Sequence, residues 1–187
     1  MKCYPLLLVA IIMANFANAQ FIQEKSINAQ IGFASSAPYD STTEFADTGF
    51  FLQGEFILKV KSWFELRPYA GLVLTKSDGL DFNGEPTFEK SVTRAMLIGG
   101  KVRVRAPIPY FAPYIELGLG SSIGKFETLT TYYTIDKKGL TYHIPVGFGV
   151  ELGRHNNVDL GLGFYFQSGV KQGIGALAIG ITIPLKS

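Results

Sequence analysis

The segment QGIGALAIGITIPL, residues 172–185, decides the fold because its apolar residues recur at every second position. In an extended chain Leu177 and Ile179 lie on one face, whereas Ala178 and Gly180 lie on the other. This period of two is the signature of a β-strand. The segment is uncharged but only 14 residues long, and Gly, Thr and Pro interrupt it. A membrane-spanning helix needs about 20 apolar residues, so the segment predicts a strand and not such a helix.

The same alternation runs through the rest of the chain and predicts eight strands. Before the last segment it occurs in Ile27–Ser35, Phe50–Lys59, Phe64–Tyr69, Met96–Val104, Ile115–Gly120, Tyr142–Leu152 and Val158–Gln167. Large apolar residues form one face of these runs, and glycine, small and polar residues form the other. Besides the helix, a closed barrel is the structure that satisfies its own backbone hydrogen bonds in lipid. We therefore expect an all-β fold, an eight-stranded antiparallel up-and-down transmembrane β-barrel.

The connections between the predicted strands alternate between long and short. The long ones are Ser36–Thr48, Lys76–Ser91 and Lys125–Leu140, the short ones are Lys61–Ser62, Ala106–Pro109 and Arg154–Asn157, and the last, Ser168–Gln172, is of medium length. Outer-membrane barrels have short periplasmic turns, longer extracellular loops and an even number of strands. The pattern therefore predicts that both ends of the barrel domain lie in the periplasm.

The N-terminal residues predict a secretory signal peptide. Lys2 precedes an almost unbroken apolar run, Tyr4–Phe16, and the sequence Ala17-Asn18-Ala19 then offers small residues to a signal peptidase. We expect cleavage between Ala19 and Gln20. Residues 1–19 would then be the signal peptide, and residues 20–187 would form the barrel domain.

The composition of the mature chain excludes several classes of site. Cys3 would leave with the signal peptide, so neither a disulfide nor a cysteine-based metal site is expected. Without Lys2 the formal net charge falls from +2 to +1, which gives no reason to expect a nucleic-acid partner. A soluble exported domain would normally be more polar than a chain with 47% hydrophobic residues. We therefore expect lipid to receive the apolar surface.

With these strands and connections the chain resembles the small OmpA/OmpX-type outer-membrane β-barrels. More loosely, it resembles the outer-membrane β-barrel domain family that is abundant in Bacteroidetes-type bacteria. The resemblance covers the whole mature chain and rests on its pattern, not on a specific motif. It implies a monomer in the cell outer membrane of a Gram-negative bacterium, in contact with outer-membrane lipid and lipopolysaccharide and assembled by the barrel-insertion machinery. One departure is the C-terminus, Leu185-Lys186-Ser187, because such barrels usually end on an aromatic residue.

Charged residues on the inward face predict a closed lumen. In lipid the polar face points inward, and eight strands leave a lumen only wide enough for side chains. The inward acids are Glu55, Glu65, Glu116, Glu151 and Asp159, and the inward bases are Lys59, Arg67, Lys101, Arg103 and Arg105. Because buried charges must be paired, we predict a lumen charge network of Glu55, Glu65, Arg67, Lys101, Arg103 and Glu116. Of the other four inward residues, Lys59, Arg105 and Glu151 are expected in water at the periplasmic rim.

Two alternatives to a non-enzymatic barrel remain open. The first is an enzyme that modifies lipid A or phospholipid, with His143 as its base and Ser122 within reach on the preceding strand. His155 lies in a tight turn, and no His-x-Ser-Asn motif occurs, so we expect no catalysis and no cofactor. The second is a soluble periplasmic lipocalin-like carrier, which would turn its apolar face inward around a ligand.

The glycine pairs and the loops carry weaker signals. Gly118-x-Gly120 and Gly147-x-Gly149 occupy alternate strand positions, which predicts that small inward residues make room in a narrow barrel. Asp81-x-Asn83-Gly84 resembles the start of a calcium loop but fits a simple turn better, so no metal is expected. The β-prone segment Thr128–Thr134 could extend two strands beyond the membrane. An unknown ligand could bind at the surface loops, although none of them contains a recognisable binding motif.

Overall fold

A computed structural model describes residues 22–40, 47–81 and 83–185 of the 187-residue chain. The predicted signal peptide and its cleavage position between Ala19 and Gln20 lie outside the described residues. Nowhere in the described ranges does the chain form a helix long and apolar enough to span a membrane.

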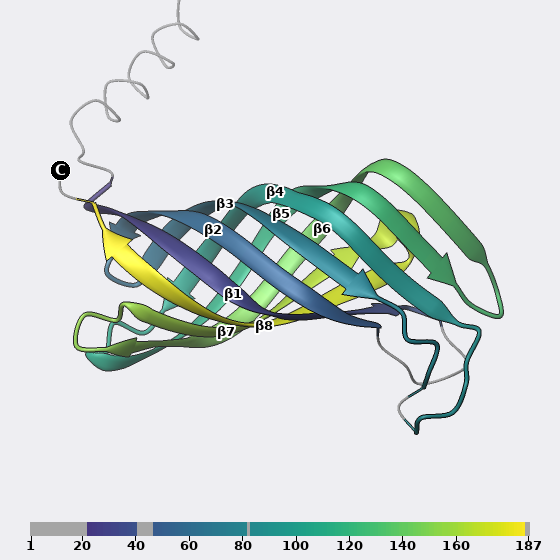
Figure 1. Ribbon diagram of the computed structural model, residues 1–187. Coiled ribbons are helices and arrows are strands. Elements are labelled where there is room, and N and C mark those ends of the chain that lie inside the picture. Colours follow the sequence, from purple (N-terminus) through teal and green to yellow (C-terminus); the bar gives the residue numbers. More distant parts are fainter. Residues whose placement is uncertain (1–21, 41–46, 82, 186–187) are drawn as a thin grey trace, which may run out of the picture.

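Eight strands form one closed sheet (Figure 1). They are β1 (Glu24–Pro38), β2 (Asp47–Lys61), β3 (Phe64–Lys76), β4 (Lys90–Arg105), β5 (Tyr110–Leu129), β6 (Thr134–Gly153), β7 (Val158–Gln167) and β8 (Gln172–Pro184), with the short 3-10 helix η1 (Ser168–Val170) before β8. Each strand pairs antiparallel with the next, and β8 pairs with β1 to close the barrel. The predicted fold class, an eight-stranded antiparallel up-and-down barrel, is confirmed.

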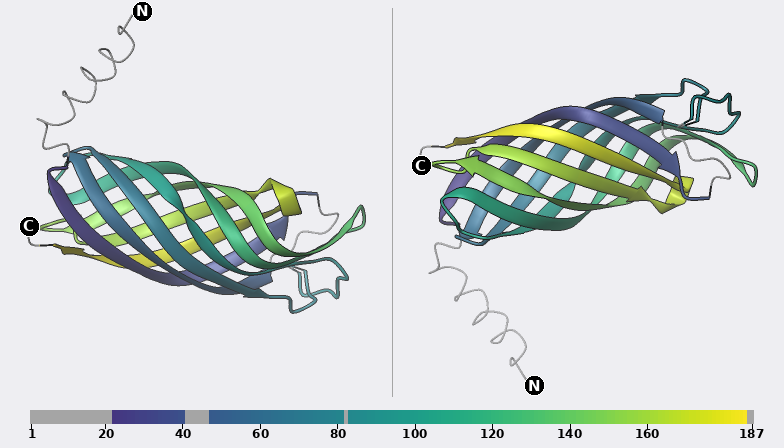
Figure 2. Two further views of the ribbon diagram at one scale, coloured as in Figure 1. Left: turned by 90° about the horizontal axis from the view of Figure 1, so that it is seen from above. Right: turned by 90° about the horizontal axis from the view of Figure 1, so that it is seen from below.

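The two ends of the barrel differ (Figures 1 and 2). One end, here called the terminal end, holds the start of β1, the end of β8 and the short turns after β2, β4 and β6. The opposite loop end holds the long connection of residues 77–89 and the projecting β5–β6 hairpin. The predicted long connection Lys125–Leu140 is wrong, because β5 continues to Leu129 and β6 begins at Thr134. Its β-branched and aromatic residues extend both strands, as the composition of Thr128–Thr134 allowed.

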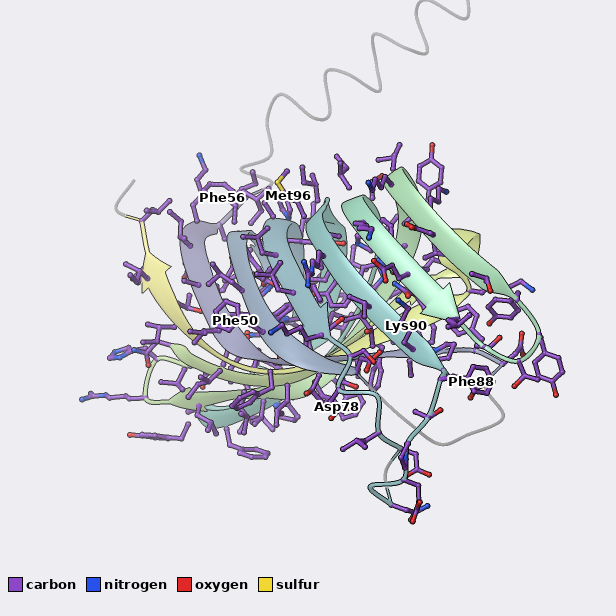
Figure 3. All side chains as sticks on the ribbon, turned by 45° about the vertical axis from the view of Figure 1, so that its right-hand side comes forward. Phe50, Phe56, Asp78, Phe88, Lys90 and Met96 are labelled. Atoms are coloured by element: carbon purple, nitrogen blue, oxygen red, sulfur yellow. The ribbon has the colours of Figure 1, made fainter. Side chains whose placement is uncertain are left out.

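Large apolar side chains cover the outside of the wall, as alternation along each strand dictates. Phe56 and Met96 point away from the barrel in Figure 3, and both are more than one third exposed. Ile31 on β1, Leu119 on β5 and Ile181 on β8 are more than half exposed. A lipocalin-like carrier needs the opposite arrangement, with its apolar face around the lumen. The structure therefore gives no support to that alternative.

Candidate functional site

Arg67 on β3 is the first centre of a charge network in the half of the lumen nearer the terminal end. Its side chain is 1% exposed, hydrogen-bonds to carboxylates from three strands and lies 3.7 Å from a fourth carboxylate, Asp159 on β7. Nη1 donates to Glu55 Oε2 at 2.8 Å, Nη2 donates to Glu65 Oε2 at 2.7 Å, and Nη2 also donates to Glu151 Oε1 at 2.7 Å. Charge-assisted hydrogen bonds of this length are stronger than hydrogen bonds between neutral groups, so one guanidinium joins β2, β3 and β6.

Arg103 on β4 is the second centre and is fully buried. Its Nη2 donates to Glu116 Oε2 at 2.7 Å, and its Nη1 donates to Asp159 Oδ2 at 2.5 Å and to Glu151 Oε1 at 3.0 Å. The guanidinium carbon lies 3.5 Å from the centre of the Tyr114 ring, which is cation–π distance. The Tyr114 hydroxyl in turn donates to Asp159 Oδ1 at 2.6 Å. Arg103 therefore joins β4 to β5, β6 and β7.

Lys101 links the two centres. Its Nζ lies 2.5 Å from Glu55 Oε1 and 2.6 Å from Glu116 Oε1, so it bridges a carboxylate bound by Arg67 and one bound by Arg103. The structure thus brings together all six side chains of the predicted lumen charge network. They come from four consecutive strands, β2 to β5, and Glu151 on β6 and Asp159 on β7 extend the network around the lumen.

The prediction for the three rim residues is wrong for Glu151, and Arg105 lies at the rim beside Ser62 but is not free in water. Glu151 is 2% exposed and binds both arginine centres, because strand tilt brings its position on β6 inside the barrel. The Arg105 side chain is 12% exposed and pairs with Glu151. Lys59 does lie at the rim, where it pairs with the exposed Glu24. The network therefore contains five carboxylates and four cations within the described residues, whereas the predicted network had three of each.

An aromatic layer lies directly beyond the charges, toward the loop end. Tyr69 and Tyr165 stand edge to face with ring centres 6.4 Å apart, and His143 stands edge to face with Tyr165 at 5.4 Å. The Tyr165 hydroxyl donates to Gln53 Oε1 at 2.7 Å, and Gln53 Nε2 donates to Glu55 Oε1 at 2.8 Å. The aromatic layer is therefore hydrogen-bonded to the charge network below it.

The predicted approach of Ser122 to His143 is found. Ser122 Oγ lies 2.7 Å from His143 Nδ1, and it accepts a bond from Gln167 Nε2 at 2.7 Å. The other ring nitrogen, Nε2, lies 2.5 Å from the Tyr69 hydroxyl, where a catalytic triad would place a carboxylate. Ser122 and His143 are 0% and 2% exposed. The pair therefore belongs to a buried hydrogen-bond chain, and its His143 also lines a groove of about 780 Å³ in the barrel wall.

A polar layer closes the lumen at the loop end. Gln172 at the start of β8 is fully buried and is its centre. Its Oε1 accepts bonds of 3.0 Å from both Ser91 and Thr128, and its Nε2 donates to Gln167 Oε1 at 3.1 Å. Inside the wall, a cavity of about 20 Å³ lies between the charged and aromatic layers, with Lys101, Tyr114 and Tyr165 among its lining residues. Such a volume holds roughly one water molecule.

Sequence reasoning missed Tyr114 and Gln53, and it left Asp159 outside the predicted network. Their positions in the sequence could have identified all three as lumen residues. Each is two residues from a member of the predicted network or lies on the same inward face. A metal site is not formed by any group of three or more His, Cys, Asp and Glu side chains in the described ranges. Asp81 makes the predicted turn, because its Oδ1 accepts bonds from the backbone amides of Asn83 and Glu85 at 2.8 Å.

Comparison with known proteins supports the fold and no finer assignment. No protein-family model and no curated protein matches the sequence. The crystal structure of Neisserial surface protein A (NspA) matches with a TM-score of 0.60 and 13% identity, over 86% of this chain and 97% of that chain. The outer membrane protein OprG from Pseudomonas aeruginosa matches with a TM-score of 0.50 and 12% identity, over 89% and 99%. At these identities the likeness shows the fold alone. The chain has the fold of small eight-stranded outer-membrane β-barrels, and the looser resemblance to the Bacteroidetes-type family stays a prediction.

Proposed function

We propose that this protein is a non-enzymatic integral outer-membrane barrel with a lumen closed by side chains, which supports the envelope or binds at the cell surface through its loops. In this proposal the terminal end faces the periplasm and the loop end faces the outside. The apolar outer wall and the fold shared with NspA and OprG support the location.

The observation that carries the proposal is the three-layered filling of the lumen. Arg67 and Arg103 are buried, and each binds carboxylates of several strands. An ion that entered from either end would have to break these pairs, and breaking a buried pair costs several kcal/mol. The filling therefore supports a structural barrel and speaks against an open pore.

Two measurements test the proposal together. In detergent electrophoresis the unboiled protein is expected to run as a compact, fast band and the boiled protein near its mature mass. In planar lipid bilayers the inserted protein is expected to give no large, steady conductance. Recovery in the soluble periplasm without a mobility shift would refute the membrane location, and a steady open channel would refute the closed lumen.

A second candidate is the lipid-modifying enzyme, which the 2.7 Å contact between Ser122 and His143 favours. Its test is acyl release from lipid A and from phospholipid by the purified protein in mixed micelles. We expect no release above that of a boiled sample. Release that disappears in both His143→Ala and Ser122→Ala variants would establish the enzyme instead, provided that both variants keep the compact unboiled band.

A further inference from the structure

Three cations stand side by side on the outer wall near the loop end. Arg94 on β4 is the cross-strand partner of Lys125 on β5, and Lys125 is the partner of Lys138 on β6. Neighbouring strands lie about 4.8 Å apart. Arg94, Lys125 and Lys138, here called the basic row, are exposed or half-exposed on the outward face. Like charges directly opposite one another destabilise a sheet.

The carboxylates near the basic row neutralise it only in part. Lys125 and Lys90 both bind Glu127, and Asp136 lies opposite Glu127 on β6. Within the described part of the chain, neither Arg94 nor Lys138 has a carboxylate at ion-pair distance. An excess of positive charge therefore remains on this face and favours an anionic ligand.

An apolar groove begins directly below the basic row, toward the terminal end. Leu140, two residues after Lys138 on the same face of β6, is part of its lining. The groove has a volume of about 780 Å³, and its apolar lining comprises Ile98, Leu119, Leu140, Tyr142, Ile144 and Phe166. Lys137 also lines it, which adds a further cation at its edge. We refer to it as the wall groove.

The pairing of the strands explains why the wall is hollowed here. Between β5 and β6 the pairing runs from Leu117–Val146 to Gly120–His143 without the two pairs in between. One of the four residues in this gap is Pro145, which has no amide hydrogen to donate. Pairing between β6 and β7 begins only at Ile144–Phe166, so β6 has no strand partner on that side nearer the loop end. These interruptions leave the surface of β5, β6 and β7 open beside the basic row.

We propose that the basic row and the wall groove together bind one molecule of lipid A, with its phosphates on the basic row and an acyl chain in the wall groove. The inference rests on the proposed function, because it takes the loop end to face the outer leaflet, where the phosphorylated lipid is lipid A. Charge complementarity and the order of the two features along the wall carry it. A membrane lipid has this same order, with an anionic headgroup above apolar chains. Guanidinium and ammonium groups are the usual protein partners of phosphate.

The test is binding of bisphosphorylated lipid A to the refolded protein in neutral detergent micelles, measured by native mass spectrometry. The test variant Arg94→Gln/Lys125→Gln/Lys138→Gln removes the basic row. The matched control Lys25→Gln/Lys61→Gln/Arg154→Gln removes the same charge from exposed positions at the terminal end. We expect the apparent Kd to rise at least about tenfold in the test variant and to stay unchanged in the control. Both variants must keep the compact unboiled band.

A second pair of probes separates a lipid site from simple attraction of charge. The variant Leu119→Ser/Tyr142→Ser changes two exposed residues of the wall groove. It is expected to weaken binding of lipid A but not of the deacylated, phosphorylated disaccharide.

Equal affinity of the test and control variants for lipid A would overturn the proposal, and so would equal affinity of the wild type for lipid A and inorganic polyphosphate. The measurement is made in micelles. If the protein reaches the outer membrane but binds no lipid A in micelles, the proposed lipid A site is refuted and the proposed function still stands.

Discussion

Two arginines on neighbouring strands organise the interior of this protein. Arg67 and Arg103 are both almost fully inaccessible to solvent, and both contact Glu151. A buried charge without a partner costs far more than a rim charge, because no water can replace the lost contact. The loss of stability when a charged lumen residue is replaced should therefore depend on how deep it lies in the lumen and not on its charge alone.

The variant Arg67→Met tests this dependence. It would leave four carboxylates with one partner fewer, so the free energy of unfolding should fall by about 3–5 kcal/mol. The matched variant Lys59→Met breaks the rim pair with Glu24 and should cost about 0–1 kcal/mol. The measurement is urea unfolding in lipid vesicles, followed by the fluorescence of Trp63, the one tryptophan of the chain. Equal losses in the two variants would contradict a buried network.

Gly120 shows how the lumen accommodates its aromatic layer. A Cβ atom at this position would lie 2.4 Å from both His143 Nε2 and the Tyr69 hydroxyl. The variant Gly120→Val should therefore lower the free energy of unfolding by about 1–3 kcal/mol through overpacking. Gly100→Val is the control, because nothing lies within 4 Å of its Cβ position. In the same unfolding assay, Tyr69→Phe should restore part of the stability of Gly120→Val, since it removes the clashing hydroxyl. No recovery would argue against this contact.

At the scale of the element, β8 faces the lumen with one side and the outside of the barrel with the other. Its residues alternate between exposed Leu177, Ile179 and Ile181 and buried or half-buried Ala176, Ala178 and Gly180. Small inward residues leave space for side chains from the facing strands, and large outward ones supply the surface that lipid would contact. The strand therefore tolerates a charge only where it approaches the end of the apolar band.

A pair of arginine substitutions on β8 tests the membrane assignment. Ile179 pairs with Ile31 and Leu160 within the apolar band, so Ile179→Arg should lower the free energy of unfolding in lipid vesicles by about 2–4 kcal/mol. Ile183 lies near the terminal end, and Ile183→Arg should cost about 0–1 kcal/mol. The same urea titration measures both. A soluble barrel would show no such dependence on depth, because water would solvate either arginine.

At the scale of the whole molecule, the closed sheet places the start of β1, the end of β8 and the connections of residues 62–63, 106–109 and 154–157 at one end. The connection of residues 77–89 and the β5–β6 hairpin lie at the other end (Figures 1 and 2). An outer-membrane barrel would expose the loop end to the medium and the terminal end to the periplasm. The two ends should therefore differ in their accessibility on intact cells.

Single cysteines offer a direct measure of this orientation, because the mature chain as predicted contains no other cysteine. On intact cells a membrane-impermeant maleimide should label Glu85→Cys, in the connection of residues 77–89. It should label Arg154→Cys, in the turn after β6, only after the outer membrane is opened. Labelling of Arg154→Cys alone on intact cells would invert the orientation, and labelling of neither variant, even after opening, would show that the cysteines are not accessible.

The sequence by itself determined the class of fold, the number of strands and the inward or outward direction of most side chains. These features follow from the period of two, which is local and can be read along each strand. It also determined that the six residues of the predicted lumen charge network face inward.

Only the tertiary structure decided which of these charges meet. Arg67 on β3 and Glu151 on β6 are not on neighbouring strands, and their contact depends on the tilt and stagger that close the barrel. The same closure buries Glu151, which the sequence placed at the rim, and leaves Lys59 outside the network. The length of the β5–β6 hairpin was also decided by pairing, because polar strands beyond the apolar band carry no hydrophobic signal but still satisfy each other's backbone hydrogen bonds.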